Sequence, residues 1–201
     1  MARVEFFFDI SSPWTWLAFE NIQPMSEELG FEIEWRPFMV GGLFNTINPS
    51  VYEMRANPVP AKWDYMTKDL ADWARHSGLE IKWQPTVFPV NSVKVMRACL
   101  VAIDQNKLVS FAHACFEMYW TEDQDISQND VVADACRRSD MDPAEVAQAI
   151  QQPDLKQRLI ANSEELINRG GFGTPTIFVN TDDMYFGNDR LPLIRTAIER
   201  G

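Results

Sequence analysis

The chain has 201 residues, 46% of them hydrophobic, so it can bury a substantial core in one large domain or two closely packed ones. Its formal net charge of -11 disfavours nucleic acid or an anionic membrane as the main partner, because both reward clustered lysine and arginine. No stretch is apolar enough to span a bilayer and no signal-peptide pattern opens the sequence, so we expect a cytoplasmic protein.

Three widely spaced cysteines, Cys99, Cys115 and Cys136, lie in helical patterns. An odd number at such spacing favours neither a disulfide framework nor a metal site. We therefore expect the three cysteines to act as small, buried apolar residues of the core, and we expect no bound metal.

The first third of the chain predicts a β-α-β unit. An apolar run over residues 3–8 predicts a strand buried on both faces. The Ser12-Pro13 pair is typical of a helix start with a serine N-cap, and Gly30 suits the end of that helix. Pro24 is expected to kink or interrupt the helix. Alternation over residues 31–35 predicts a second strand with one exposed face.

The middle of the chain predicts a long loop followed by helices. Residues 39–60 are rich in glycine, asparagine and proline, which favours a loop that covers a site or joins two domains. Helical patterns are then predicted over residues 61–77, 91–105, 107–121, 128–138, 143–150 and 154–168. This part of the chain is predicted to be all-helical.

The end of the chain predicts a β-β-α unit. Residues 176–186 predict a β-hairpin, and a last helix is expected from Asn188 or Asp189. Together the two ends form an α/β, thioredoxin-like sheet with an all-helical insertion. We expect residues 1–38 and 170–201 to form the thioredoxin-like domain, and residues 39–169 to form the loop and the inserted helical domain.

Three motifs in this order resemble a known family. They are Phe-Asp-x-x-Ser-Pro-x-x-Trp at residues 8–16, Gly-x-Pro-Thr at 173–176 and Phe-Gly-Asn-Asp-Arg-Leu at 186–191. The pattern resembles the 2-hydroxychromene-2-carboxylate isomerase family over the whole chain. The related kappa-class glutathione transferases share this layout, and both groups belong to the DsbA branch of the thioredoxin superfamily.

The resemblance gives Ser12 a role in catalysis. Redox members of the superfamily open the first helix with Cys-x-x-Cys, whereas Ser12 and Thr15 stand at those positions here. The resemblance implies glutathione as cofactor, with the Ser12 hydroxyl donating a hydrogen bond to its thiolate. Such a bond would lower the thiol pKa from about 8.5. Alternatively Ser12 is only an N-cap, worth about 1 kcal/mol, or Ser11 makes the contact.

Further glutathione contacts are implied by the two later motifs. By resemblance the Thr174-Pro175 bond is cis and the Thr174 backbone pairs with the cysteinyl part of glutathione. From sequence alone a trans bond is the default, because cis accounts for only about 5–6% of such bonds. Asn188 and Asp189 are implied at the glutamyl end, where Asp189 would accept from the α-ammonium. The alternative is that they form an ordinary helix N-cap.

The remaining candidates concern charge and the substrate. Lys62 matches a lysine near the thiol or substrate in the relatives, and a cation there suits a carboxylate of either molecule. Its alternative role is that of a solvated surface lysine. The candidate substrate-binding residues are Ser11, Trp14, Asn57, Asn91 and Arg97.

The function implied is a glutathione-dependent isomerase in the catabolism of aromatic compounds. It would interconvert 2-hydroxychromene-2-carboxylate and trans-o-hydroxybenzylidenepyruvate by reversible thiolate addition, so the partner is a small aromatic carboxylate. Two alternatives stay open: a glutathione transferase that keeps the adduct, and a non-catalytic binding module. A disulfide oxidoreductase is disfavoured by Ser12 and Thr15. The relatives are commonly dimers, which implies a homodimer.

Overall fold

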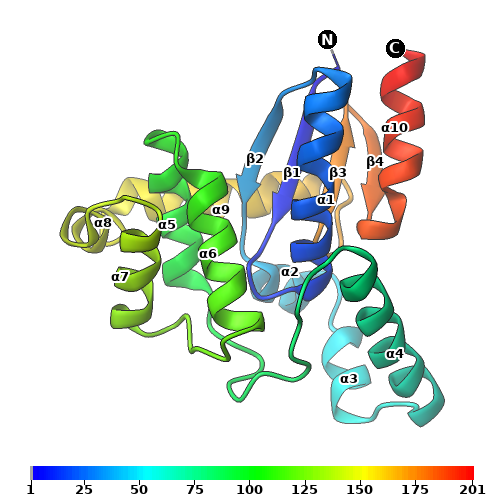
Figure 1. Ribbon diagram of the computed structural model, residues 1–201, viewed down its shortest axis with the longest axis horizontal. Coiled ribbons are helices and arrows are strands. Elements are labelled where there is room, and N and C mark those ends of the chain that lie inside the picture. The colour runs from blue at the N-terminus through cyan, green and yellow to red at the C-terminus, as the bar shows by residue number, and fades with distance from the viewer. Residues whose placement is uncertain (1) are drawn as a thin grey trace.

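Residues 2–201 are described by the computed structural model and form a mixed sheet with strand order β2-β1-β3-β4 (Figure 1). The strands are β1 (Val4–Phe8), β2 (Ile33–Pro37), β3 (Thr176–Val179) and β4 (Asp183–Phe186). Strand β1 pairs parallel with β2 and antiparallel with β3, so the two ends of the chain meet in one sheet. The thioredoxin-like α/β fold is thereby confirmed.

The predicted buried strand and hairpin are confirmed, whereas the second strand is displaced. Every residue of β1 is buried, and β3 pairs antiparallel with β4. The second strand covers Ile33–Pro37 in place of residues 31–35, because its pairing with β1 sets Phe8 opposite Pro37. Proline is tolerated there because β2 is an edge strand.

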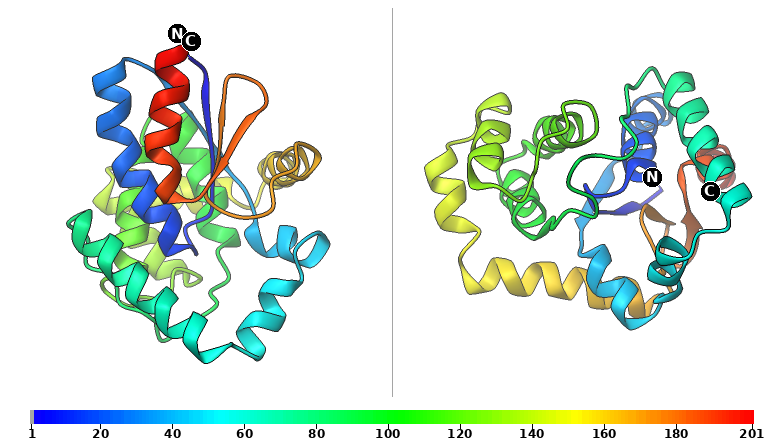
Figure 2. Two further views of the ribbon diagram at one scale, coloured as in Figure 1. Left: turned by 90° about the vertical axis from the view of Figure 1, so that its right-hand side faces the viewer. Right: turned by 90° about the horizontal axis from the view of Figure 1, so that it is seen from below.

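Helices cover both faces of the sheet. Helices α1 (Pro13–Leu29) and α10 (Leu191–Arg200) lie on one face, and α9 (Pro153–Asn168) lies on the other (Figure 2). The capping signals are confirmed, because the Ser12 side chain accepts from the Thr15 amide and Gly30 ends α1 in the left-handed region.

Helix α1 continues through Pro24, so the expected interruption is wrong. Pro24 is exposed, and water can satisfy the carbonyl that its missing N–H frees. The opposite face carries Phe19, Ile22 and Met25, all buried in the core. Burial of that face keeps the helix continuous despite the lost hydrogen bond.

The insertion contains seven helices before α9 within residues 2–201. They are α2 (Val40–Thr46), α3 (Ser50–Ala56), α4 (Pro60–His76), α5 (Val93–Asp104), α6 (Leu108–Trp120), α7 (Asn129–Arg138) and α8 (Pro143–Ala149). The predicted loop over residues 39–60 is wrong, since α2 and α3 lie within it. Val40 and Leu43 are buried against Phe7 and Phe178 of the sheet, and this tertiary packing overrides the weak local helix propensity.

The sheet and the insertion share one continuous core. Phe6 and Phe8 of β1 belong to the same buried cluster as Phe111, Phe116 and Trp120 of α6. The sequence predicts boundaries between the thioredoxin-like domain and the insertion after residue 38 and before residue 170. These positions lie just after the ends of β2 and α9. The division into two domains stays a prediction.

The three cysteines are free and buried, which confirms their prediction as apolar core residues. Among residues 2–201, no helix combines the length and the apolar character needed to cross a bilayer. The same residues contain no cluster of histidine, cysteine, aspartate and glutamate suited to a metal ion.

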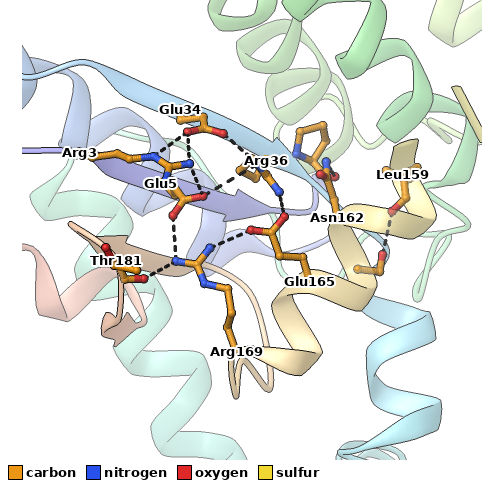
Figure 3. A network of polar contacts seen from close by, with 11 residues as sticks. Arg3, Glu5, Glu34, Arg36, Leu159, Asn162, Glu165, Arg169 and Thr181 are labelled. Carbon is orange, nitrogen blue, oxygen red and sulfur yellow. Dashed lines mark hydrogen bonds and ion pairs between the residues drawn. The ribbon is translucent and has the colours of Figure 1, made fainter. Parts of the chain in front are cut away.

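A buried carboxylate anchors α9 to the sheet (Figure 3). Glu5 is only 1% exposed, and it pairs with Arg3 at 3.1 Å and with Arg169 at 2.8 Å. Glu165 of α9 bridges Arg169 and Arg36 on the same surface. A buried charge is tolerated only when it is paired and hydrogen-bonded, as Glu5 is here. The network therefore fixes the last turns of α9 against β1 and β2.

A second polar contact joins α1 to α6 and should make stability depend on pH. Glu20 accepts from Trp16 Nε1 and lies 2.7 Å from His113 Nδ1, and this hydrogen bond raises the pKa of His113. A raised folded pKa means that the contribution is fully present below the unfolded pKa of about 6.5 and is lost as pH rises through the folded value.

We therefore expect His113→Gln to lower the free energy of unfolding more at pH 5.5 than at pH 9, by less than about 1 kcal/mol since the pair is partly exposed. Urea unfolding at both pH values measures the difference. In a Glu20→Gln background the pH-dependent part should vanish. An equal loss at both pH values would show that the contact does not depend on charge.

Candidate active site

Helices α2, α3 and α4 lie beyond one end of the sheet (Figure 1). Their side chains line part of a cavity of about 710 Å³. Its lining comes from the β1–α1 junction, from these three helices, from the extended segment before α5 and from the turn before β3. Six residues predicted from the sequence share this lining: Ser11, Ser12, Trp14, Lys62, Asn91 and Thr174. Residues far apart in the chain thus meet at the start of α1.

Ser12 lies at the N-terminus of α1, where unpaired amides and the helix dipole favour negative charge. Its hydroxyl accepts from the Thr15 amide at 3.3 Å and lies 3.5 Å from the Thr174 carbonyl oxygen, to which it donates. The first turn of α1 carries no acidic residue. The serine hydroxyl and the helix terminus therefore present a site for an anion to the cavity.

Thr174 faces Ser12 across the floor of the cavity, and the Thr174-Pro175 bond is cis, as the family resemblance implies. The Thr174 hydroxyl accepts from the Asp9 amide at 3.1 Å and lies 2.8 Å from the Thr15 hydroxyl. Its side chain is therefore held by β1 and α1. Within residues 2–201 no hydrogen bond engages the Thr174 amide, so the N–H stays available.

The carboxylate of Asp9 holds the floor of the site together. Asp9 is fully buried; Oδ1 accepts from the Ser11 amide, and Oδ2 accepts from the Val40 amide and the Ser92 hydroxyl, each at 3.0 Å. These donors belong to the β1–α1 loop and to the starts of α2 and α5. Burial raises the pKa of the Asp9 carboxyl, and its hydrogen bonds act in the opposite direction.

Asn188 and Asp189 lie beside the cis-proline but outside the cavity lining. The preceding Gly187 amide donates to the Pro175 carbonyl at 3.1 Å, which brings this turn next to Thr174. Asp189 is exposed and pairs with Arg190 at 3.0 Å, whereas Asn188 is buried with neither amide atom partnered within residues 2–201. Within residues 2–201 no side chain caps α10 or the short 3-10 turn before it, so the alternative of an N-cap is wrong.

Three further predicted residues do not line the cavity. Pro175 lies behind Thr174, and Asn57 is an exposed residue at the end of α3. Arg97 lies in α5, and its Nε is buried without a partner among the described residues. The structure therefore does not bring Asn57 or Arg97 together with Ser12.

Sequence reasoning missed most of the aromatic wall and one cation. The additional aromatic wall residues are Phe44, Tyr52, Trp63, Trp83, Phe88, Phe172 and Phe186, and the cation is Arg55. Phe44, Tyr52 and Arg55 lie in α2 and α3, which the composition predicted as loop. The only available signal was the set of aromatic residues within that segment. From the sequence, Asp9 was identified only as one residue of the first motif. Its position at the end of a buried strand was a signal, because a buried carboxylate needs hydrogen-bond donors around it.

Comparisons with known proteins give the family and the fold. The model of the DsbA-like thioredoxin domain matches residues 3–199. A 2-hydroxychromene-2-carboxylate isomerase of Pseudomonas putida is 24% identical over 202 residues, which cover 98% of this chain and 94% of that protein. Glutathione S-transferase kappa 1 of Homo sapiens is 26% identical over 205 residues, with 95% and 88% covered.

Solved structures agree on the fold. A selenomethionine 2-hydroxychromene-2-carboxylate isomerase has a TM-score of 0.83 at 22% identity, covering 98% of this chain and 94% of that one. The cytosolic disulfide reductase DsbM of Pseudomonas aeruginosa with GSH has a TM-score of 0.66 at 13% identity, with 98% of each chain covered.

Replacement of Asp9 by asparagine tests its role as an anchor. The two Asp9 oxygens accept from three donors, whereas in asparagine one of these oxygens is replaced by an NH2 group that cannot accept, so at least one buried donor is left unpaired. We expect Asp9→Asn to lower the free energy of unfolding in urea by about 1–3 kcal/mol. Asp182→Asn, at the exposed hairpin turn, is the matched control. An Asp9→Asn protein as stable as the control would contradict this role.

Proposed function

Because the chain belongs to the family of DsbA-like thioredoxin domains and its relatives include isomerases and glutathione transferases, we propose that it is a glutathione-dependent isomerase. The proposed reaction interconverts 2-hydroxychromene-2-carboxylate and trans-o-hydroxybenzylidenepyruvate in the catabolism of aromatic compounds. The observation that carries this proposal is the position of Ser12, at the N-terminus of α1 and opposite Thr174 in an aromatic cavity.

The thiol must come from a ligand, because none of the chain's own cysteines suits the task. Burial raises the pKa of Cys99 and Cys115 well above the ordinary value and that of Cys136 to about 11. Glutathione supplies the sulfur instead. The Ser12 hydroxyl turns from its 3.5 Å contact with Thr174 and donates to the thiolate, which the N-terminus of α1 also stabilises.

The turn before β3 and the turn after β4 would hold the rest of glutathione. The Thr174 backbone pairs with its cysteinyl part, next to the cis bond to Pro175. Asn188 and Asp189 bind the glutamyl end, with Asp189 exchanging Arg190 for the α-ammonium. Lys62 binds a carboxylate of glutathione from α4. In support, Asp189 is exposed and the Thr174 amide has no partner within residues 2–201.

When bound, glutathione would supply a thiolate that adds reversibly to the alkene carbon β to the ketone, while the conjugated carbonyl takes up the electron pair of the alkene. The thiolate would leave again once the former double bond has rotated, so glutathione would not be consumed. Aromatic walls suit the aryl ring, and a cytoplasmic homodimer completes the proposal by likeness to the family.

Variants of Ser12 test the activation of the thiol. A hydrogen bond to a charged group is worth about 1.5–3 kcal/mol, so Ser12→Ala should raise the pKa of bound glutathione and lower isomerase turnover about tenfold or more. Ultraviolet absorbance of the thiolate against pH measures the pKa. Ser12→Thr keeps a hydroxyl and should retain more activity. Full turnover in Ser12→Ala would overturn this mechanism, and a loss confined to Ser11→Ala would move the contact to that serine.

Product analysis separates the isomerase from a glutathione transferase, the alternative favoured by the kappa-class relative. With trans-o-hydroxybenzylidenepyruvate, we expect the isomer to form while all glutathione is recovered. A stable glutathione conjugate in stoichiometric yield would assign the chain to the transferases. Calorimetry with glutathione tests the alternative of a non-catalytic module. If no glutathione binding is detected at millimolar concentration, the chain would be a module that binds some other partner and does not use glutathione.

A further inference from the structure

The cavity is positively charged although the molecule as a whole is acidic. The sequence has 29 acidic and 18 basic residues, yet the described residues that line the cavity include two basic side chains and no acidic one. The two cations are Lys62 on α4 and Arg55 on α3. Because such an uneven distribution favours anions at short range, the cavity is suited to an anionic ligand.

Arg55 lies between two aromatic rings of the cavity wall. Its guanidinium carbon is 5.2 Å from the centre of the Phe88 ring and 5.9 Å from that of Phe44. These rings orient the guanidinium while leaving its in-plane N–H donors open. Arg55 is an exposed residue, and desolvation by its neighbours lowers the pKa of its guanidinium from the usual value.

Arg55 also lacks a carboxylate partner, unlike several other arginines of this chain. Arg138, Arg158 and Arg195 each donate two hydrogen bonds to the two oxygens of a single carboxylate. No ion pair or hydrogen bond joins Arg55 to another side chain within residues 2–201, and its described contacts are with aromatic rings. A guanidinium placed on an apolar wall without a partner is available to a ligand.

We propose that Arg55 binds the carboxylate of the substrate, and that it makes the site selective for planar conjugated carboxylic acids over their neutral esters. This inference rests on the proposed function, because it concerns the same cavity. The planar guanidinium matches a carboxylate with two parallel hydrogen bonds, and the rings of Phe44 and Phe88 pack against the conjugated part of the same ligand. Lys62, which lies on α4, then remains available to bind a carboxylate of glutathione.

Binding without turnover tests the proposal. Calorimetry with trans-cinnamate and with methyl trans-cinnamate, both without glutathione, measures the preference for the charged form. We expect the acid to bind at least about tenfold more tightly than the ester. Arg55→Met should weaken the acid about tenfold or more and leave the ester within about twofold, while Arg55→Lys should restore part of the preference.

Two further variants provide the controls. Arg75→Met removes an exposed arginine of α4 that pairs with Asp72 outside the cavity, and it should leave both affinities unchanged. Urea unfolding of each variant checks that the fold is intact. An equal loss for acid and ester in Arg55→Met would reduce Arg55 to a packing role and overturn the proposal. So would a wild-type protein without preference, or a preference that Lys62→Met abolishes and Arg55→Met keeps.

Glutathione calorimetry on the same proteins separates this inference from the proposed function. If wild type does not bind glutathione but prefers the acid through Arg55, the proposed function fails and the carboxylate site stands. If glutathione binds and isomerisation proceeds while Arg55→Met keeps the preference for the acid, the proposed function stands and the role of Arg55 is wrong.

Discussion

The carboxylate of Asp9 is the interaction on which the geometry of the site depends. A buried carboxylate is costly unless its oxygens are satisfied, and Asp9 is satisfied by the amides of Ser11 and Val40 and the hydroxyl of Ser92. Those three groups begin or precede three different helices. The end of β1 therefore fixes where α1, α2 and α5 start, and the first residues of α1 and α2 and the segment before α5 form part of the cavity lining.

The same strand anchors the insertion at a second point. Side chains alternate along a strand, so Glu5 and Phe7 lie on one face of β1, and Asp9 directly follows the strand. Glu5 holds the end of α9 through Arg169, and Asp9 holds the starts of α2 and α5. The inserted segment is thus attached to one strand at both of its ends. Because both attachments are buried, the position of the insertion is closely tied to that of Ser12.

Local signals in the sequence predicted the elements whose ends are set by a few neighbouring residues. The start of α1 at Ser12-Pro13 and its end at Gly30 are of this kind. Helix α2 could not be predicted in this way, because Val40 and Leu43 become helical through burial against the sheet.

In the candidate site, too, some residues could be predicted from local sequence and others could not. Motifs identified Ser12 and Thr174, which meet across the cavity, whereas Asn57 lies outside the lining. Arg55 belongs to none of the sequence motifs. It became a candidate ligand-binding residue because its guanidinium lies over the rings of Phe44 and Phe88. Such a position depends on how the insertion packs, which no local pattern in the sequence records.

The charge of the molecule and that of its cavity act over different distances. Charges on the surface are screened over about 8 Å at physiological salt, whereas groups within a partly desolvated cavity interact at contact. The net charge of -11 therefore need not exclude an anionic ligand from this site. The proposed reaction brings a thiolate, a glutathione carboxylate and a substrate carboxylate together. In that proposal the N-terminus of α1 faces the thiolate, Lys62 faces a glutathione carboxylate and Arg55 faces the substrate carboxylate, so each of these three anions has a positive group beside it.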